Sequence, residues 1–399
     1  MAYDVIIAGG GPAGSTTGRL LAERGARVLL LDKQAFPRDK PCGGGVTLRA
    51  ASAQGADLSK VVERTVYGAR FSLRLGPEFD RRFTQPLSYM TQRLRLDSHL
   101  LEQAAGAGVE VHEQEAVRAV DASSSGVQVL TSRDSHSAQI LIGADGANGI
   151  TGRLLGLRRE YEEAVAFEGN IPWTSAVSRD WEDLVALDLG GLAGGYGWVF
   201  PKGEHLNVGV GAWKYASFTL RPKLVALARR YGFDEAKLEN LRGHHLPVRM
   251  AGSPIARGPV AVVGDAAGLI DPLTGEGIHM AFASGRLAAE AALKVLGGAA
   301  TGMETYQREV DTGLQPELTV SRQLQEIFNF APPPFLTLMR RNRRFWLFFC
   351  YLIRGDLTYL DFVRMIGPMR VAVTFFSGVS QRKRQGKVSA GLRAITTSS

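Results

Sequence analysis

Three glycines near the start of the chain have the spacing that binds a dinucleotide. Gly9, Gly11 and Gly14 form G-x-G-x-x-G within the stretch YDVIIAGGGPAGSTTGRLLAERGARVLLLD. The first glycine permits a tight turn, the second lets a pyrophosphate approach the backbone, and the third lets a helix pack closely on a strand. Asp32, which ends the stretch, can accept hydrogen bonds from ribose hydroxyls. We therefore predict that residues 3–32 bind a dinucleotide.

The segments around these glycines are predicted to form a strand–helix–strand unit. Residues 5–8 and 28–31 are short apolar runs of the kind that form strands buried on both faces. The N-terminus of the intervening helix offers free N–H groups to the phosphates. A similar strand, loop and long helix recur in GPVAVVGDAAGLIDPLTGEGIHMAFASGRLAAEAALKVL. There Asp265 can bind a ribityl-type hydroxyl, and the helix after Gly277 can stabilise negative charge on a reduced ring.

A proline- and glycine-rich loop follows the first unit. Residues 33–50 read KQAFPRDKPCGGGVTLRA, an irregular loop that leads into a helix. Glycine backbones in such a loop could approach a flat ligand closely. Cys42 is either a small buried hydrophobe or a sulfur beside a reacting ring, and the residues leave both readings open.

Two later segments alternate apolar and polar residues as strands do. Residues 65–90 contain VYGARFSLRL, and residues 165–245 contain LNVGVGAW among several tryptophans and tyrosines. This pattern predicts an antiparallel sheet with one face covering a ligand. Aromatic residues in such a sheet are usually core, so a pocket needs independent support.

These segments together predict an α/β fold, of α+β character overall. A Rossmann-like nucleotide-binding domain would carry an inserted antiparallel β-sheet domain and a helical C-terminal region. The predicted nucleotide-binding domain is discontinuous and comprises residues 1–65, 91–165 and 255–300. The sheet domain would comprise residues 66–90 and 166–254, and the C-terminal region residues 301–399.

The positive charge of the chain is concentrated at its C-terminal end. From Arg340 onward there are 12 lysines or arginines and two aspartates, whereas the rest of the chain has 35 basic and 37 acidic residues. A nucleic-acid-binding protein would need basic residues across its docking face, so we predict no nucleic-acid partner. Residues 345–353 form an apolar run of nine residues, well short of the roughly 20 that span a bilayer.

We predict that this C-terminal region lies on the inner membrane surface as a peripheral contact. Its apolar patches coincide with the excess positive charge, and a second patch ends in Arg382, Lys383 and Arg384. A core helix followed by a solvated basic tail is the alternative that the sequence leaves open.

Cysteine and histidine usage indicates neither a disulfide framework nor a metal site. Cys42 and Cys350 are far apart, and no signal-peptide pattern precedes Asp4, so we predict a cytoplasmic protein. The seven histidines have no metal-ligand spacing.

The motifs resemble those of known flavoproteins. GGGPAG, RLRLD, ADGAN and GDAAGLIDPLTGEGI resemble the glutathione-reductase-like flavoproteins of the para-hydroxybenzoate hydroxylase type. KPCGGG at 40–45 and YGWVFPKG at 196–203 are similar to the geranylgeranyl reductase family. The resemblance extends through Leu296, about three-quarters of the chain.

This resemblance implies FAD as the dinucleotide and assigns roles to individual residues. The implied cofactor-binding residues are Gly9, Gly11, Pro12, Ala13, Gly14, Asp32, Lys33, Cys42, Gly43, Gly44, Arg93, Val117, Asp145, Gly146, Gly264, Asp265, Gly275, Gly277 and Ile278. The implied substrate-binding residues are Tyr196, Trp198, Phe200 and Pro201. The candidate catalytic residues are Cys42, Tyr196 and Trp198, and the proton donor would be Cys42, Tyr196 or a flavin-bound water. His279, at the start of a helix, is expected to be structural.

The implied reaction saturates carbon–carbon double bonds of a geranylgeranyl or polyprenyl chain on a lipid, quinone or chlorophyll-type carrier. Hydride would come from N5 of reduced flavin, and a proton would reach the other carbon. The chain has no second strand–glycine–helix unit for NADPH, so the reductant would be transiently docked NADPH or a ferredoxin-type carrier.

Two alternatives differ from this reaction. An FAD monooxygenase or halogenase would have the same fold, although Tyr196 and Phe200 depart from the W-x-W-x-I-P of flavin halogenases. A non-enzymatic prenyl-binding escort, similar to Rab GDP-dissociation inhibitors, would not need the intact phosphate-binding glycines.

Overall fold

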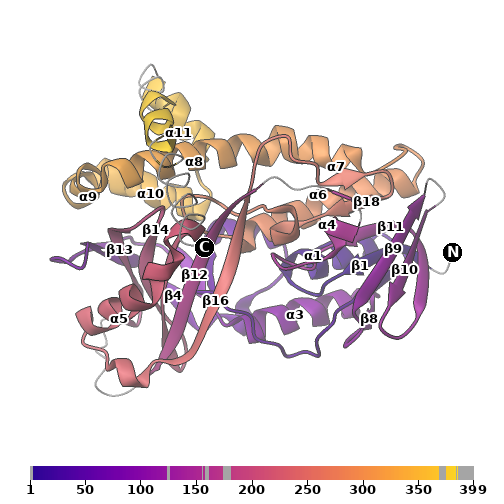
Figure 1. The fold of residues 1–399 in the computed structure, drawn as a ribbon, viewed down its shortest axis with the longest axis horizontal. Helices are drawn as coiled ribbons and strands as arrows, with labels where there is room; N and C mark the ends of the chain where they lie inside the picture. The colour runs from indigo at the N-terminus through magenta and orange to yellow at the C-terminus, as the bar shows by residue number, and fades with distance from the viewer. Residues whose placement is uncertain are drawn as a thin grey trace, which may run out of the picture.

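The computed structural model describes residues 3–123, 126–154, 156, 157, 161–173, 181–367, 374–382 and 384. An eight-stranded sheet occupies one half of the molecule and a seven-stranded sheet the other, and the C-terminal helices gather above the second sheet (Figure 1). The mixed α/β composition agrees with the predicted fold class.

The eight-stranded sheet carries the dinucleotide motif. Its main order is β17–β18–β11–β1–β2–β8, and β10 and β9 are added beside β11. The strands are β1 (Tyr3–Ala8), β2 (Val28–Leu31), β8 (Glu110–His112), β9 (Val117–Ser123), β10 (Gly126–Thr131), β11 (Ser135–Gly143), β17 (Ala256–Arg257) and β18 (Val260–Val262). β1 pairs in parallel with β2 and β11, as its apolar run predicted. Ligands bind such sheets at the carboxyl ends of the strands, where these three strands end together.

Two helices of this half pack closely because small residues separate them. A Cβ at Gly285 of α6 would lie 2.8 Å from Ala13 O of α1, and Thr17 Oγ1 donates to Gly285 O at 3.1 Å. The helices of this half are α1 (Pro12–Ala22), α3 (Arg93–Gly106), α4 (Thr151–Leu154), α6 (Ile278–Leu296) and α7 (Glu304–Glu309). This contact places α6 beside α1, the helix that begins within the glycine motif.

The seven-stranded sheet has the order β16–β12–β15–β14–β13–β5–β6. Its strands are β5 (Gly68–Leu73), β6 (Phe79–Arg82), β12 (Tyr161–Pro172), β13 (Leu184–Leu192), β14 (Gly195–Pro201), β15 (His205–Trp213) and β16 (Glu239–Arg249). All neighbouring pairs are antiparallel as predicted, except that β13 and β5 are parallel. This parallel pair joins residues 65–90 to residues 165–245, the two segments in which apolar and polar residues alternate. α5 (Leu220–Arg230) buries Leu224 and Leu227 in a cluster with Val199 and Val208, so it covers one face of the sheet.

A small three-stranded sheet ties the cysteine loop to the body. Its order is β3–β7–β4, and Gly45 pairs with Met90. The elements here are β3 (Gly45–Thr47), α2 (Leu48–Gln54), η1 (Ser59–Val61), β4 (Arg64–Val66) and β7 (Ser88–Met90). Thr47 caps α2 by accepting from Ala50 N at 3.1 Å. The predicted loop and helix therefore occur in the expected order.

The C-terminal helices follow a proline-rich break. Ala331 leaves the helical conformation, and α9 begins at Pro332, a position where a helix lacks intrahelical N–H partners and tolerates proline. The helices are α8 (Gln315–Phe330), α9 (Pro332–Arg341), α10 (Arg343–Arg354), α11 (Tyr359–Ile366) and residues 374–382. Shorter helical turns elsewhere are η3 (Lys214–Thr219), η4 (Glu235–Lys237), η5 (Gly264–Ala267) and η6 (Val310–Leu314).

The apolar run at 345–353 contributes to the protein core. Trp346 is 3% exposed and lies edge-on to Phe71 of β5, with ring centroids 6.1 Å apart. Trp346 Nε1 donates to Arg82 O at 3.0 Å, and Cys350 is fully buried. One face of α10 therefore matches the core-helix alternative. Across the described part of the chain, every helix is too short or too polar to cross a bilayer.

One residue of the basic triplet at 382–384, Arg384, contacts the body of the protein. Arg384 forms ion pairs with Glu162 at 2.8 Å and Glu326 at 3.0 Å, and it lies over the ring of Trp213. Lys383 and residues 385–399 lie outside the described residues. Arg384 therefore packs against the protein and is not part of a solvated basic tail.

Candidate active site

One large cavity, about 1070 Å³ in volume, extends from the carboxyl edge of the eight-stranded sheet to the C-terminal helices. Most residues expected to bind a cofactor or substrate line it; the lining members are Gly9, Gly11, Pro12, Ala13, Asp32, Lys33, Cys42, Gly43, Gly44, Arg93, Val117, Asp145, Gly146, Tyr196, Trp198, Phe200, Asp265, Gly275, Gly277 and Ile278. Gly14, Gly264 and Pro201 are not among the residues that line the cavity. The structure thus gathers residues from every predicted motif.

The glycine motif leaves a backbone surface without side chains. Gly9 has φ +112°, and a Cβ there would lie 2.4 Å from Ala144 O. A Cβ at Gly14 would lie 1.9 Å from Gly9 O. Gly11, in contrast, has room for a side chain: a Cβ there would lie 3.4 Å from Arg38 Nη2, at ordinary van der Waals distance. We call Gly9, Gly11 and Gly14 the glycine cradle.

Two buried arginines face the cradle. Arg93 forms a two-fold ion pair with Asp97, with both distances 2.7 Å. Burial opposes its charge, but Asp97 outweighs burial and raises the pKa of Arg93. Arg38 Nη1 is 3.2 Å from the same carboxylate, whereas buried Arg38 Nε has no hydrogen-bond partner among the described residues. Arg38 Nε also lies 3.7 Å from Asp32 Oδ2, so the two arginines face two carboxylates. The guanidinium groups nevertheless lie near Gly11, where a pyrophosphate would lie.

The two strand-end aspartates are fixed by backbone donors. Asp32 accepts from Gly10 N at 2.8 Å and from Gln34 N at 2.9 Å. Asp145 Oδ2 accepts from Ile150 N and Thr151 N at 2.7 and 2.8 Å, which caps α4. The predicted turn at Asp145 thus steadies a helix.

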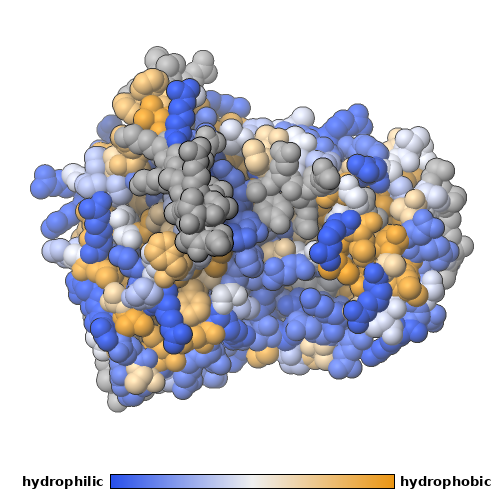
Figure 2. Space-filling view, in the orientation of Figure 1, coloured by the Kyte–Doolittle hydropathy of each residue, from blue (hydrophilic) through white to orange (hydrophobic). Residues whose placement is uncertain are grey.

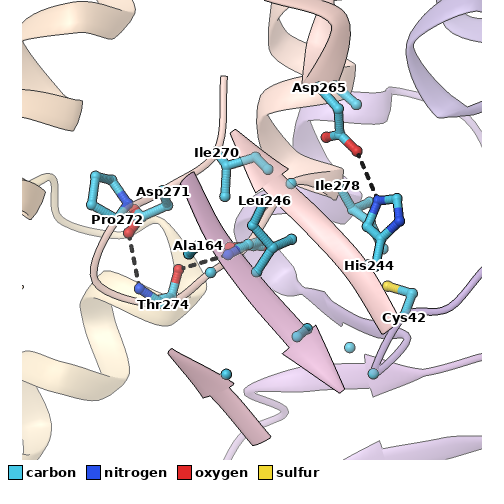
Figure 3. Close-up of a pocket in the computed structure, with 18 of the residues that line it drawn as sticks. Cys42, Ala164, His244, Leu246, Asp265, Ile270, Asp271, Pro272, Thr274 and Ile278 are labelled. Atoms are coloured by element: carbon cyan, nitrogen blue, oxygen red, sulfur yellow. Dashed lines mark hydrogen bonds and ion pairs between the residues drawn. The ribbon is translucent and has the colours of Figure 1, made fainter. Parts of the chain in front are cut away.

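Asp265 lies at the centre of a charged group on the cavity wall. Lys40 Nζ is 2.8 Å from Asp265 Oδ2, and His244 Nε2 is 3.7 Å from the same oxygen. Burial opposes ionisation of Asp265, but Lys40 and His244 outweigh it and hold its pKa well below the usual range. Figure 3 shows Asp265, His244, Cys42 and Ile278 on one side of the cavity.

These features fit FAD. The cradle excludes side chains where a pyrophosphate would approach, and the arginines opposite it supply positive charge. Buried polar atoms without hydrogen-bond partners in the described chain also border the cavity, namely Arg38 Nε, Asp145 Oδ1 and His244 Nε2. Such atoms need partners, and a polar ligand would provide them.

Comparison with known proteins identifies the group to which the site belongs. An FAD binding domain model matches residues 2–186. Menaquinone reductase of Mycobacterium tuberculosis is 36% identical over 312 residues, which cover 72% of this chain and 76% of that protein. Chloroplastic geranylgeranyl diphosphate reductase of Oryza sativa subsp. japonica is 30% identical over 355 residues, which cover 81% of this chain and 74% of that protein.

The chain belongs to the geranylgeranyl reductase family. A crystal structure of a geranylgeranyl bacteriochlorophyll reductase-like protein from Thermoplasma acidophilum matches with a TM-score of 0.71 and 26% identity, covering 82% of this chain and 88% of that one. The chain is accordingly an FAD-dependent oxidoreductase, as its motifs predicted.

The aromatic motif of this family member forms one wall of the cavity. Tyr196, Trp198 and Phe200 follow one another along β14, with successive ring centroids 6.1 and 6.2 Å apart. The Tyr196 hydroxyl donates to Thr274 O, and Trp198 Nε1 donates to Asn207 Oδ1 at 2.8 Å. Burial, with the nearby carboxylates, raises the pKa of Tyr196. Tyr196 therefore keeps its proton, and the bond to Thr274 would have to break for that proton to move.

Sequence reasoning missed several charged residues of the site. Lys40, Lys202 and Glu276 lie inside the motifs that were recognised, whereas Arg38 and His244 had no local signal. Burial raises the pKa of Glu276 to about 7, although a hydrogen bond of 2.7 Å from Thr47 Oγ1 favours the carboxylate. A carboxyl that is half protonated near neutral pH thus lines the cavity.

The far end of the cavity is mainly apolar. Gln325 and Asn329 of α8 are polar members of the lining there. The apolar lining members in the C-terminal helices include Leu324, Ile327, Phe328, Phe335, Leu338, Phe345, Trp346, Phe348, Phe349, Leu352, Ile353 and Phe362. Leu187 and Leu189 of β13 face the same space. The apolar run that the sequence placed at a membrane therefore contributes to the pocket.

Two histidines of the eight-stranded sheet form a compact group with a carboxyl. His112, Glu115 and His136 have ligand atoms within 4.8 Å of one another, although the sequence spacing predicted no metal group. Both rings contact the Glu115 carboxyl, at 2.9 and 2.8 Å, and with Thr131 they outweigh burial and lower its pKa to about 2. His279 is 8% exposed and lies outside the cavity lining.

Proposed function

We propose that this chain saturates carbon–carbon double bonds of a geranylgeranyl or polyprenyl chain carried by a lipid, quinone or chlorophyll-type molecule. The observation that carries the proposal is the continuity of one cavity from the glycine cradle, past Cys42 and Tyr196, to an aromatic apolar end. A ligand with a long apolar tail fits such a space, because burying the tail is favourable and few polar groups oppose it. The names of the relatives place reductases of menaquinone and geranylgeranyl diphosphate among similar chains.

FAD, when bound in its reduced form, supplies the hydride for this reaction. The glycine cradle, Arg38, Arg93 and Asp265 would hold it, and the loop at Cys42 would border its ring. The alkene gains one hydride and one proton, so its π bond is replaced by two C–H bonds.

The residues of the chain must position the alkene and handle the proton. An isolated alkene accepts hydride poorly unless a proton reaches the other carbon, which gives that carbon positive character. The faces of Tyr196 and Trp198 would stabilise such charge by cation–π attraction. Cys42, Tyr196 and a flavin-bound water are candidate donors, and Glu276 is a further group that holds a proton near neutral pH.

We further propose that the protein works at a membrane surface. Apolar side chains are exposed on the C-terminal helices, namely Phe330, Leu338, Tyr351, Met365, Phe375 and Phe376. Figure 2 shows hydrophobic residues beside hydrophilic ones at the upper left, where Figure 1 places α11. Leu338 is 43% exposed and also lines the cavity, so the apolar end of the cavity opens at this patch. A prenyl chain could then enter from the bilayer.

The test of the reaction is anaerobic. Purified protein with FAD, reduced chemically, is incubated with geranylgeranyl diphosphate or menaquinone, and the products are examined by mass spectrometry. We expect products heavier by about 2 Da for each saturated bond. NADPH and reduced ferredoxin are then compared as electron sources. A reduced protein that leaves every prenyl substrate unsaturated would contradict the proposal, and oxygen-dependent NADPH consumption with hydroxylated or halogenated product would favour the monooxygenase or halogenase alternative.

A further inference from the structure

The two motifs typical of the family contact each other directly. Trp198 and Phe200 alternate along β14, so their side chains leave the strand on the same face, and Lys202 follows directly after the strand ends at Pro201. A Cβ at Gly43 would lie 2.9 Å from Phe200 Cδ2 and 3.3 Å from Trp198 Nε1. Gly43 therefore lacks a side chain because the aromatic motif already occupies that space.

Lys202 occupies the corresponding space at Gly44. A Cβ at Gly44, where φ is +62°, would lie 2.0 Å from Thr91 O and 2.5 Å from Lys202 Nζ. Lys202 is 1% exposed, and its Nζ donates to Gly43 O and, at 2.9 Å, to Thr91 O. A buried ammonium is costly unless its N–H groups have acceptors, and these carbonyls provide them.

A buried carboxyl holds the other side of the same loop. Glu168 of β12 is 7% exposed and accepts from Cys42 N at 2.7 Å. The N–H of Cys42 is thus bound by a side chain of the seven-stranded sheet, and the carbonyl of Gly43 by the side chain that directly follows β14 of that sheet. Cys42 Sγ also accepts from Gly44 N at 3.4 Å, so the sulfur depends on the same loop conformation.

We propose that Lys202 is a positioning residue that holds the loop at 42–44 against the seven-stranded sheet and thereby sets the exposure of the Cys42 thiol to the cavity. Lys202 lies outside the cavity lining, in contrast to Cys42, so it acts through the loop. This inference goes beyond the reductase proposal, because it concerns the loop whatever the substrate is.

The charge of Lys202 gives the proposal a measurable pH dependence. Burial lowers the pKa of Lys202 to about 8, while Cys42, Glu63 and Glu168 favour its charged form. His205 also faces it, and burial and the lysine together lower the pKa of His205. Below pH 8 the ammonium makes charge-assisted bonds to both carbonyls, and above it the neutral amine holds the loop less strongly.

The test measures thiol reactivity in FAD-saturated protein. Iodoacetamide alkylation of Cys42 is followed by mass spectrometry across a pH range. Cys350 is fully buried, and burial raises its pKa to about 12, so its alkylation reports unfolding. In Lys202→Met we expect the alkylation rate of Cys42 at pH 7, where the wild-type lysine is charged, to rise roughly tenfold, the factor given by about 1.4 kcal/mol of local opening. We also expect the ratio of the variant rate to the wild-type rate to fall above pH 8, because the neutral wild-type amine holds the loop less strongly. A lysine that only filled space would give equal rates in the two proteins at every pH, since methionine fills a similar volume.

Two variants and one wild-type measurement complete the test. Lys202→Arg keeps the charge at every pH, so its alkylation rate at pH 7 should match that of the wild type. Lys214→Met, at an exposed lysine after the neighbouring strand, should change neither quantity. If Lys202→Met does not fold, hydrogen exchange of residues 42–45 in the wild type is compared on both sides of pH 8, after correction for intrinsic rates. A Lys202→Met protein with the wild-type alkylation rate at pH 7, a rate ratio that does not change across pH 8, or exchange protection that is unchanged across pH 8 would overturn the proposal. Neither readout needs a prenyl substrate, so failure of the reductase proposal is detected separately.

Discussion

At the scale of the residue, the glycine cradle gives the most direct prediction. A Cβ at Gly14 would lie 1.9 Å from Gly9 O, so Gly14→Ala must push α1 away from β1. We expect an unfolding free energy lower by about 1–3 kcal/mol, typical of overpacking, and loss of bound FAD. Equilibrium unfolding in urea and the flavin absorbance of purified protein measure the two effects.

Gly106→Ala is the matched control for this prediction. Gly106 ends α3, and an added Cβ would meet no atom within 4 Å. It should therefore keep FAD and lose no stability. If Gly14→Ala retained the cofactor as tightly as Gly106→Ala, the cradle would not be the phosphate site.

A second residue-scale prediction concerns the stability of the fold against pH. The pKa of Glu276 is raised from 4.5 to about 7, mainly by burial, so the folded state binds more protons than the unfolded state between these values. Stability from this group is present below pH 4.5 and is lost as pH rises through 7. The loss is at most about 3 kcal/mol, because a pKa shift of one unit corresponds to about 1.4 kcal/mol.

Glu276→Gln should remove this contribution while keeping an acceptor for Thr47. Urea unfolding at pH 5 and pH 8 measures it: the wild type should lose more stability than the variant over that interval. Equal losses in both proteins would show that Glu276 ionises normally in the fold.

At the scale of the element, the apolar pattern of α10 was compatible with either a membrane-surface segment or a core helix. Trp346 is 3% exposed against Phe71, and it donates to Arg82 O. We expect Trp346→Ala to lower the unfolding free energy by about 3–5 kcal/mol, as large core truncations do. Tyr351 lies on the same helix and is 38% exposed, so Tyr351→Ala should cost less than about 1 kcal/mol. Similar losses in the two variants would mean that α10 is not anchored by its buried face.

The elements could be predicted from the sequence where their signal was local. The apolar runs of β1 and β2, the glycines between them and the aspartate after them specify a strand–helix–strand unit without help from the rest of the chain. The parallel pairing of β5 with β13 could not be predicted, because it joins segments more than a hundred residues apart. The role of Lys202 was hidden for the same reason, since its acceptors Gly43 O and Thr91 O belong to distant segments.

At the scale of the whole molecule, the distribution of charge and apolar surface suggests how substrate reaches the cavity. Arg340, Arg341, Arg343 and Arg344 are exposed on α9 and α10. They lie on α9, together with Leu338, and on the adjoining α10, and Leu338 is both exposed and part of the cavity lining. Each arginine near an anionic bilayer contributes about 1 kcal/mol of attraction. In the proposed membrane contact, apolar side chains around the opening would then enter the headgroup region, and the arginines would lie beside the entrance for a prenyl chain.

Replacing these four arginines by glutamine should therefore weaken binding to vesicles containing phosphatidylglycerol by about a hundredfold or more, as roughly 1 kcal/mol for each charge implies. Cosedimentation with such vesicles, and with neutral phosphatidylcholine vesicles, measures the effect. The matched control replaces four exposed arginines elsewhere, at Arg24, Arg133, Arg221 and Arg257. Because its net charge is the same as that of the test variant, equal weakening in the two would show that general charge, and not this face, attracts the bilayer. Retained reduction of a detergent-dispersed substrate by the test variant, with loss of reduction in vesicles, would place the defect at docking and leave the cavity intact.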